Sequence, residues 1–254
     1  MKKYEGFLID LDGTMYRGTE KIDEAVSFVK TINEQNLPYL FVTNNSTRTK
    51  EQVAEKLVSF GVPAEPKHVL TTSMATAQYI KDEKKNAKVY FTGEAGLKQA
   101  LSEAELIYEE ENPDYVVIGM DQQITYEKLA KACLAVRKGA KFLSTNPDIA
   151  LPTERGFLPG NGSLTAVVSV STTVEPVFIG KPEPIIVEQA LKALGTPKDK
   201  TIMIGDNYHT DIQAGLRAGV DTLLVYTGVT TKEAMKEIKE SPTFAINSLS
   251  EWMF

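Results

Sequence analysis

The stretch Phe7-Leu8-Ile9-Asp10-Leu11-Asp12-Gly13-Thr14 decides how the rest of the chain is interpreted. A short apolar run bounded by Asp and Gly predicts a buried strand that ends abruptly and presents two carboxylates where the backbone turns. In an open α/β sheet, ligands bind in the crevice beyond the carboxyl ends of the strands. We therefore expect Asp10 and Asp12 at a ligand site, although an Asp-Gly turn after a core strand would explain the same residues.

The composition is that of a globular protein without a nucleic-acid footprint. A chain of 254 residues with 42% hydrophobic residues is long enough for one large domain or two modest ones. Lysine and arginine number 28 against 34 acidic residues, the formal charge is -6, and no dense basic cluster stands out. Binding of anions must therefore be local, and no nucleic-acid partner is expected.

Cysteine content and the N-terminal residues bear on the compartment in which the protein works. The single cysteine, Cys133, cannot form an internal disulfide, which fits a reducing compartment. Acidic residues interrupt any apolar signal-peptide segment near the start, and no later stretch is long enough to span a bilayer. We expect a soluble, cytoplasmic protein with no membrane partner. The oligomeric state stays open, a homo-oligomer included.

Three further apolar segments are expected to be strands that end at unusual polar residues. They are 38–42 before Thr43-Asn44-Asn45-Ser46, 176–179 before Gly180-Lys181-Pro182, and 201–204 before Gly205-Asp206-Asn207-Tyr208-His209-Thr210-Asp211. Taken singly, each has an ordinary explanation. Lys181 would be a surface cation, Asp211 a helix N-cap, and the small residues after the second strand caps for orphan amides.

The alternation of these strands with helical periodicity predicts the fold class. Apolar residues recur at helical spacing in 22–35, 49–60, 125–138 and 184–194. Alternating strands and helices predict an α/β fold with a doubly wound, mostly parallel sheet. A charged run at 81–86 precedes a second strand-and-helix rhythm. We expect a core domain of residues 1–82 and 178–254 and an inserted α/β domain of residues 83–177.

In order along the chain, D-x-D-G-T, T-N-N-S, G-K-P and G-D-N-x-x-T-D resemble the four signatures of the haloacid dehalogenase superfamily of aspartyl phosphatases. The second and third motifs are weak by themselves, but all four in sequence, each after an apolar strand, are typical of the superfamily. The resemblance implies a Rossmann-like core with an inserted cap domain. The length and layout of the insert resemble the NagD-type, nitrophenylphosphatase-like branch.

The resemblance also implies a role for each acidic motif residue. Asp10 is the expected nucleophile, because a carboxylate can form an aspartyl-phosphate. Asp12 is the expected acid and base, protonating the leaving oxygen and later activating water. Mg²⁺ suits such an oxygen-rich site. Its ligands, by similarity, are the side chains of Asp10 and Asp206 and the backbone carbonyl of Asp12, with Asp211 binding directly or through water.

Other motif residues are expected to hold the phosphate group of a substrate. Lys181 would offer a positive charge to the nucleophile and the phosphate. Thr43, Asn44 and the backbone amides from Leu11 to Gly13 would bind the equatorial oxygens.

The inserted domain should select the substrate. A cap over the strand ends would exclude water and contact the leaving group. Polar residues follow strand-like segments there, and we expect Asn146, Asp148 and Asn161 to face the cleft. The alternative is that Asn146-Pro147-Asp148 is a simple turn and that Gly160 and Gly162 lead into a helix.

These motifs lead to one principal hypothesis of function and one alternative. The principal hypothesis is a Mg²⁺-dependent phosphomonoesterase that acts on a small-molecule phosphate ester, such as a nucleotide, a sugar phosphate or a phosphorylated cofactor. The alternative is a phosphoacceptor or ligand-binding module that keeps the same site but turns over slowly.

Overall fold

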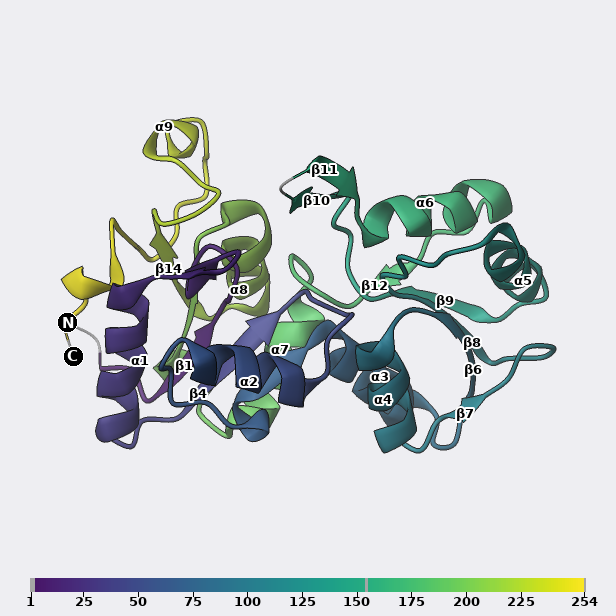
Figure 1. Cartoon of the computed structure of the whole chain (residues 1–254), viewed down its shortest axis with the longest axis horizontal. Helices are drawn as coiled ribbons and strands as arrows, with labels where there is room; N and C mark the ends of the chain where they lie inside the picture. Colours follow the sequence, from purple (N-terminus) through teal and green to yellow (C-terminus); the bar gives the residue numbers. More distant parts are fainter. Residues whose placement is uncertain (1–2, 154, 254) are drawn as a thin grey trace. The chain divides into compact units, whose positions relative to one another are not determined.

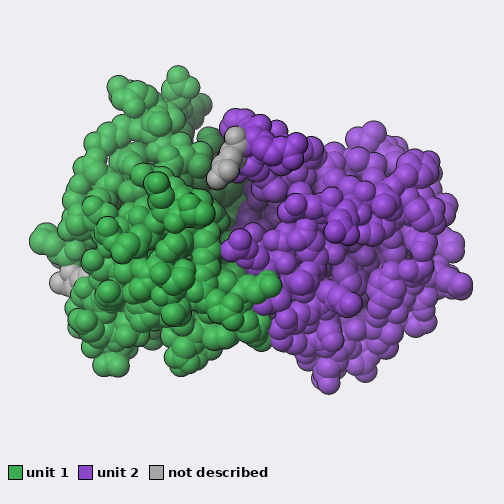
Figure 2. All heavy atoms as spheres, in the orientation of Figure 1, with its two compact units in different colours: residues 1–43, 50–70, 181–254 green, residues 44–49, 71–180 purple. Residues whose placement is uncertain are grey.

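The computed structural model describes residues 3–153 and 155–253, which form two α/β units. The first unit comprises residues 1–43, 50–70 and 181–254, and the second comprises residues 44–49 and 71–180 (Figure 2). Each unit has its own parallel sheet with helices on both faces (Figure 1). The expected fold class, a doubly wound α/β core with an inserted α/β domain, is confirmed.

The sheet of the first unit has the strand order β15-β14-β13-β1-β4-β5. Its strands are β1 (Gly6–Ile9), β4 (Tyr39–Thr43), β5 (Val69–Thr71), β13 (Thr201–Gly205), β14 (Asp221–Val225) and β15 (Phe244–Ile246). The central strands are buried over their full length, as is usual where helices cover both faces of a parallel sheet. Because β1 lies between β13 and β4, residues that follow these three strands are neighbours at one edge of the sheet.

Helices cover both faces of this first sheet. On one face, α1 (Asp23–Glu34) and α2 (Lys50–Ser59) pack their apolar stripes against Phe7, Ile9 and Phe41. On the other, α7 (Pro184–Leu194) contacts β1 and β4, and α8 (Gln213–Ala218) contacts β14. The smaller elements are β2 (Tyr16–Arg17), β3 (Glu20–Lys21), η1 (Pro66–His68), η2 (Lys198–Lys200), η3 (Tyr208–Ile212), α9 (Lys232–Met235) and η4 (Leu249–Glu251).

The second unit repeats this plan with a sheet of order β12-β9-β8-β6-β7. Its strands are β6 (Lys88–Thr92), β7 (Ile107–Tyr108), β8 (Tyr115–Ile118), β9 (Lys141–Ser144) and β12 (Val177–Phe178). One apolar cluster joins α3 (Thr72–Glu83) and α4 (Ala95–Glu103) to one face, and another joins α5 (Tyr126–Arg137) and α6 (Asn161–Thr172) to the other. An antiparallel hairpin of β10 (Ala150–Thr153) and β11 (Gly156–Pro159) precedes α6.

The second unit begins earlier in the chain than the sequence led us to expect. Helix α3 belongs to it, because Ala77 and Ile80 pack against Leu97 and Leu101 of α4. The charged run at 81–86 therefore marks the exposed end of α3 rather than a domain boundary. The chain returns to the first unit between residues 180 and 181.

In the described part of the chain, no helix is long and apolar enough to cross a membrane.

Candidate active site

Three of the expected site residues lie at the carboxyl ends of adjacent strands of the first sheet. Asp10 comes directly after β1, Thr43 is the last residue of β4, and Asp206 comes directly after β13. Ile9 is level with Phe41 on one side and with Ile204 on the other. Since all three strands run in parallel, their carboxyl ends lie at one edge of the sheet, where ligands bind in folds of this type.

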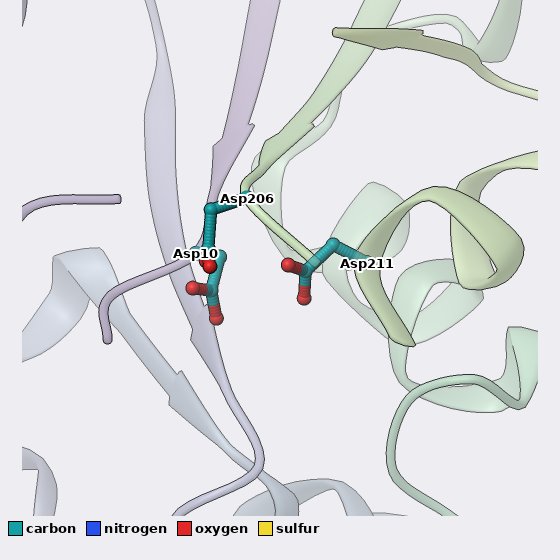
Figure 3. A group of neighbouring side chains, drawn as sticks. All are labelled: Asp10, Asp206 and Asp211. Carbon is teal, nitrogen blue, oxygen red and sulfur yellow. The ribbon is translucent and has the colours of Figure 1, made fainter. Parts of the chain in front are cut away.

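Asp10, Asp206 and Asp211 form a buried cluster of carboxylates (Figure 3). Each offers an oxygen atom that lies within 4.8 Å of the others. Asp211 reaches the cluster from η3, the helical turn after β13. Their side chains are nearly inaccessible, and three buried acids at such short range need a compensating charge.

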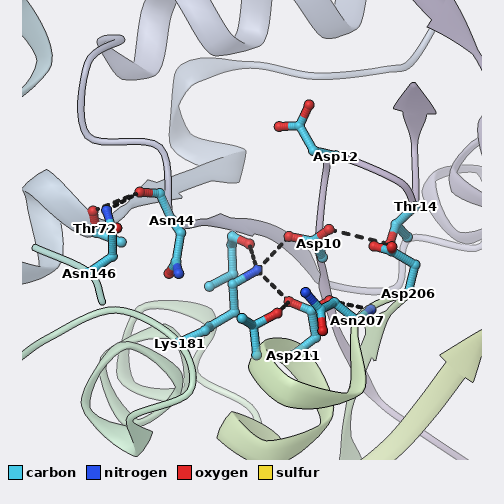
Figure 4. A network of polar contacts seen from close by, with 12 residues as sticks. Asp10, Asp12, Thr14, Asn44, Thr72, Asn146, Lys181, Asp206, Asn207 and Asp211 are labelled. Carbon is cyan, nitrogen blue, oxygen red and sulfur yellow. Dashed lines mark hydrogen bonds and ion pairs between the residues drawn. The ribbon is translucent and has the colours of Figure 1, made fainter. Parts of the chain in front are cut away.

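Lys181 supplies part of that compensation. Its side chain is only 2% exposed, and its ammonium group lies 2.7 Å from Asp211 Oδ1 and contacts Asp10 Oδ1 (Figure 4). The same group donates a hydrogen bond to the carbonyl of Val42 in β4 at 3.0 Å. A lysine placed in this way is fixed by three acceptors, so it is a structural part of the acid cluster and not a surface cation.

The cluster changes the protonation of its members. Burial and the charge of Asp211 raise the pKa of Asp10, although Lys181 opposes the shift. Burial and Asp211 likewise raise the pKa of Asp206 to about 6, against the hydrogen bond from the Val229 amide. Burial alone would lower the pKa of Lys181, but the neighbouring carboxylates outweigh it and hold that pKa above its usual value. Lys181 is therefore charged at neutral pH, and an additional cation would favour full ionisation of the acids.

The donor set fits a hard divalent cation. Asp10, Asp206 and Asp211 offer only oxygen atoms, with no sulfur or imidazole among them. Mg²⁺ prefers such ligands and is commonly held by one or two carboxylates while keeping several of its waters. The residues present therefore suit the metal that the motifs imply.

Thr14 is a site residue to which the sequence analysis gave no role. Its side chain is fully buried, and its hydroxyl lies 3.2 Å from Asp206 Oδ1 and 3.4 Å from Asp10 Oδ2. A second group that the sequence did not indicate is the amide of Val229, which donates to Asp206 Oδ2 at 2.6 Å. The position of Thr14 at the end of D-x-D-G-T was the available signal, whereas nothing local marks Val229.

Gly13 shapes the turn that follows the two motif acids. Its φ is +89°, a conformation that residues with a side chain rarely adopt. Its amide, one of the expected phosphate donors, donates to the carbonyl of Tyr16 at 2.8 Å. A Cβ atom at this position would lie 2.4 Å from Asp206 Oδ2. Gly13 thus allows the turn and the Asp206 carboxylate to approach each other.

Replacing Gly13 with alanine should disable the site without unfolding the core. The new methyl group would displace the Asp206 carboxylate, and misplacing a catalytic group by about 1 Å can cost roughly 10²-fold in rate. We expect Gly13→Ala to lower kcat/KM for phosphate release by at least that factor. Gly18→Ala is the matched control, because Gly18 also has a positive φ, +59°, but no atom within 4 Å of its would-be Cβ. Similar losses in both variants would show that strain alone, not Asp206, is responsible.

Asp12 differs from the other motif acids in being exposed. The Tyr16 hydroxyl lies 3.4 Å from Asp12 Oδ2. Figure 4 shows the Asp12 carboxylate directed away from the contact between Asp10 and Lys181. The Asp12 carboxylate is thus exposed to solvent and is not one of the three acids of the buried cluster.

Four of the expected residues, Asn44, Asn146, Asp148 and Asn161, lie in the second unit. Asn44 is half-buried, and its side-chain amide donates to Asp148 at 3.2 and 3.4 Å. Asn146 and Asn161 are buried and hydrogen-bonded to neighbouring backbone. The structure thus brings Asn44, Asn146 and Asp148 together, and Asn161 donates a hydrogen bond to the carbonyl of Asn146. Leu11, in the first unit, is buried in the core cluster beside β1.

Comparisons with known proteins identify the family of this chain. Residues 7–107 match the family model of haloacid dehalogenase-like hydrolases, and residues 178–252 match a second model described as HAD-hydrolase-like. The 5'-nucleotidase YutF of Bacillus subtilis is 63% identical over 253 residues, which cover 100% of this chain and 99% of the relative. An acid sugar phosphatase of Staphylococcus haemolyticus is 55% identical over 251 residues, covering 98% of this chain and 95% of the relative.

Solved structures give the same result. A single mutant of a thermostable NPPase from Geobacillus stearothermophilus is 61% identical, with a TM-score of 0.95 and full coverage of both chains. NagD from Escherichia coli K-12 is 30% identical, with a TM-score of 0.93 and 99% coverage of both chains. The chain belongs to the haloacid dehalogenase-like hydrolases. Within this family it is a NagD-like phosphatase, so the family inferred from the motifs is confirmed.

Proposed function

We propose that this phosphatase is a Mg²⁺-dependent phosphomonoesterase that hydrolyses small-metabolite phosphate esters through an aspartyl-phosphate on Asp10. The observation that carries the proposal is the buried contact of Lys181 with Asp10 and Asp211 at the edge of the first sheet. A lysine and three carboxylates buried together are costly for stability, which is a common sign that residues serve chemistry.

Hydrolysis divides into two displacements at phosphorus. In the first, an oxygen of Asp10 forms a bond to phosphorus while the bond to the leaving oxygen breaks, and Asp12 gives its proton to that oxygen. In the second, Asp12 as carboxylate takes a proton from water, whose oxygen forms a bond to phosphorus while the bond between phosphorus and Asp10 breaks, and phosphate is released. Asp10 is then regenerated as carboxylate, and Asp12 again carries a proton.

The other residues orient the phosphate and offset its charge. When bound by Asp10 and Asp206, with Asp211 as a direct or water-mediated ligand, Mg²⁺ would supply positive charge to the developing transition state. The backbone carbonyl of Asp12 would complete the protein ligands. Lys181 would neutralise charge on the nucleophile and phosphate, while Thr43, Asn44 and the backbone amides of Leu11 and Asp12 would hold phosphate oxygens. The Gly13 amide, which was also expected to do so, donates to the Tyr16 carbonyl instead.

The substrate is a small phosphate ester whose identity the motif residues do not determine. Two of the relatives named above are a 5'-nucleotidase and an acid sugar phosphatase. Both are more than half identical to this chain, yet their names state different substrates. A nucleotide and a sugar phosphate share the phosphate group that the core would bind. Residues of the inserted domain would therefore decide between them.

Removing and restoring the metal tests this function directly. Phosphate release is to be followed from an aryl phosphate, nucleotides, sugar phosphates and pyridoxal phosphate. Because a Lewis acid supplies several kcal/mol at such a transition state, EDTA should lower the rate at least about 10²-fold and Mg²⁺ should restore it. Metal-independent turnover would refute the Mg²⁺ assignment. No release from any ester would favour the slow-turnover binding module instead.

A further inference from the structure

We infer that Asp148 and Asn146 are positioning residues that hold Asn44 in the orientation in which it binds phosphate. This inference rests on the proposed function, in which Asn44 binds a phosphate oxygen. It also gives Asp148 and Asn146 a role different from the expected one, in which both face the substrate and select it.

Asn44 is fixed by hydrogen bonds to residues from two other parts of the second unit, the start of α3 and the segment that follows β9. Its Nδ2 atom donates to Asp148 Oδ2 at 3.2 Å and to Oδ1 at 3.4 Å. Its carbonyl oxygen accepts from Asn146 Nδ2 at 2.9 Å and from the hydroxyl of Thr72 at 3.3 Å, the contacts drawn for the labelled residues in Figure 4. Both the backbone and the side chain of Asn44 are thus held by this unit.

The residues that hold Asn44 are themselves fixed. Asn161, only 1% exposed, donates from Nδ2 to the carbonyl of Asn146 and to the Ser144 hydroxyl, each at 2.9 Å. Asn146 Oδ1 in turn accepts from the amide of Asp148 at 3.2 Å. Asn161 therefore holds Asn146 directly and, through Asn146, also Asp148. A rigid support of this kind can determine the rotamer of the side chain that it contacts.

Packing also prevents Asn44 from moving away from Asp148. A Cβ atom added to Gly180 would lie 2.6 Å from Asn44 Oδ1 and 2.7 Å from the Thr145 carbonyl. Only a glycine leaves space for the Asn44 side chain here. Asn44 is thus confined between Gly180 on one side and its hydrogen-bond partners on the other.

The chain passes between the two units within the second motif. Thr43 ends β4 and belongs to the first unit, whereas Asn44 begins the segment 44–49 of the second unit. Two consecutive residues of the second motif therefore belong to different units. A change in the residues that hold Asn44 should alter phosphate binding even though Thr43, Asp10 and Lys181 keep their places.

Charge argues against direct contact of Asp148 with the substrate. A carboxylate beside a phosphate dianion would weaken binding, since like charges repel. Acting through Asn44, the same carboxylate instead accepts from the side-chain amide and so orients its other N–H as a donor to phosphate. The effect of losing Asp148 should consequently be common to all phosphate esters and not specific to one leaving group.

A double-mutant cycle on phosphate binding tests this inference without requiring turnover. Inorganic phosphate is titrated calorimetrically into the full chain in Mg²⁺, for the unaltered protein, Asp148→Ala, Asn44→Ala and the double variant. Loss of a charge-assisted hydrogen bond that positions a ligand should weaken phosphate binding about tenfold to a hundredfold in Asp148→Ala. The double variant should bind phosphate no more weakly than Asn44→Ala alone. Asp148→Asn, which keeps an acceptor oxygen, should recover part of the affinity.

Asp82→Ala is the matched control, because Asp82 accepts a side-chain amide hydrogen bond from Gln78 at 2.6 Å in the same unit. Phosphate affinity should be unchanged in that variant. Unchanged affinity in Asp148→Ala, or additive losses in the double variant, would overturn the inference alone. A changed ratio of kcat/KM between an aryl phosphate and a nucleotide, with phosphate affinity intact, would also overturn it. If the unaltered protein binds no phosphate, both the inference and the proposed function fail.

Discussion

Asp10→Asn is expected to reduce phosphate release at least about 10⁴-fold while the protein stays folded. The amide has nearly the shape of the carboxylate but cannot form the aspartyl-phosphate. The substitution also removes one of three acids from a cluster that contains a single ammonium group. Because burial and Asp211 raise the pKa of Asp10, its charged form is unfavourable there, and a neutral side chain should not lower the free energy of unfolding.

Two measurements on purified Asp10→Asn separate chemistry from folding. Phosphate release is compared with that of Asp199→Asn, an exposed residue of the same unit, and unfolding by urea is followed for both variants. Activity near that of the unaltered protein would refute the assignment of the nucleophile. A large loss of stability together with activity would mean that Asp10 mainly supports the structure.

Much of this acid cluster could be predicted from the sequence because it depends on strand ends. Asp10 and Asp206 each follow an apolar run, and parallel strands bring their carboxyl ends to one edge of a sheet. The order of the motifs was enough to place both residues. The fold class followed from the same alternation of strands and helices.

Other features depend on packing between distant segments and leave no local pattern. The bonds from the Lys181 ammonium to Asp211 and to the Val42 carbonyl join three separate parts of the chain. The boundary between Thr43 and Asn44 was equally hidden, because T-N-N-S reads as one continuous motif. The contacts of residues 44–49 with the second unit show to which unit Asn44 belongs.

Lys181→Met should destabilise the protein strongly, by about 3–5 kcal/mol at neutral pH, and should abolish turnover. Removing one partner of a buried ion pair leaves uncompensated charge, a change that typically costs this amount. Here two carboxylates, Asp10 and Asp211, lose their shared ammonium group at once. Methionine fills a similar volume, so the loss of charge, rather than a cavity, dominates the effect.

The destabilisation in Lys181→Met should shrink as the pH falls. An acid whose pKa is higher in the folded state than in the unfolded state binds more protons when folded, so stability decreases as the pH rises through that range. The pKa of Asp206 is already raised to about 6, and that of Asp10 is raised as well. Without Lys181 the pKa of Asp10 should rise further, since the ammonium group opposes its shift.

Urea unfolding at pH 7 and pH 5 in metal-free buffer measures this dependence. The control is Lys192→Met, an exposed lysine in the last turn of α7. Lys192→Met should change stability little at either pH, whereas Lys181→Met should recover a large part of its lost stability at pH 5. Equal destabilisation by Lys181→Met at both pH values would contradict the electrostatic explanation, because protonation of the acids would then leave the cost unchanged.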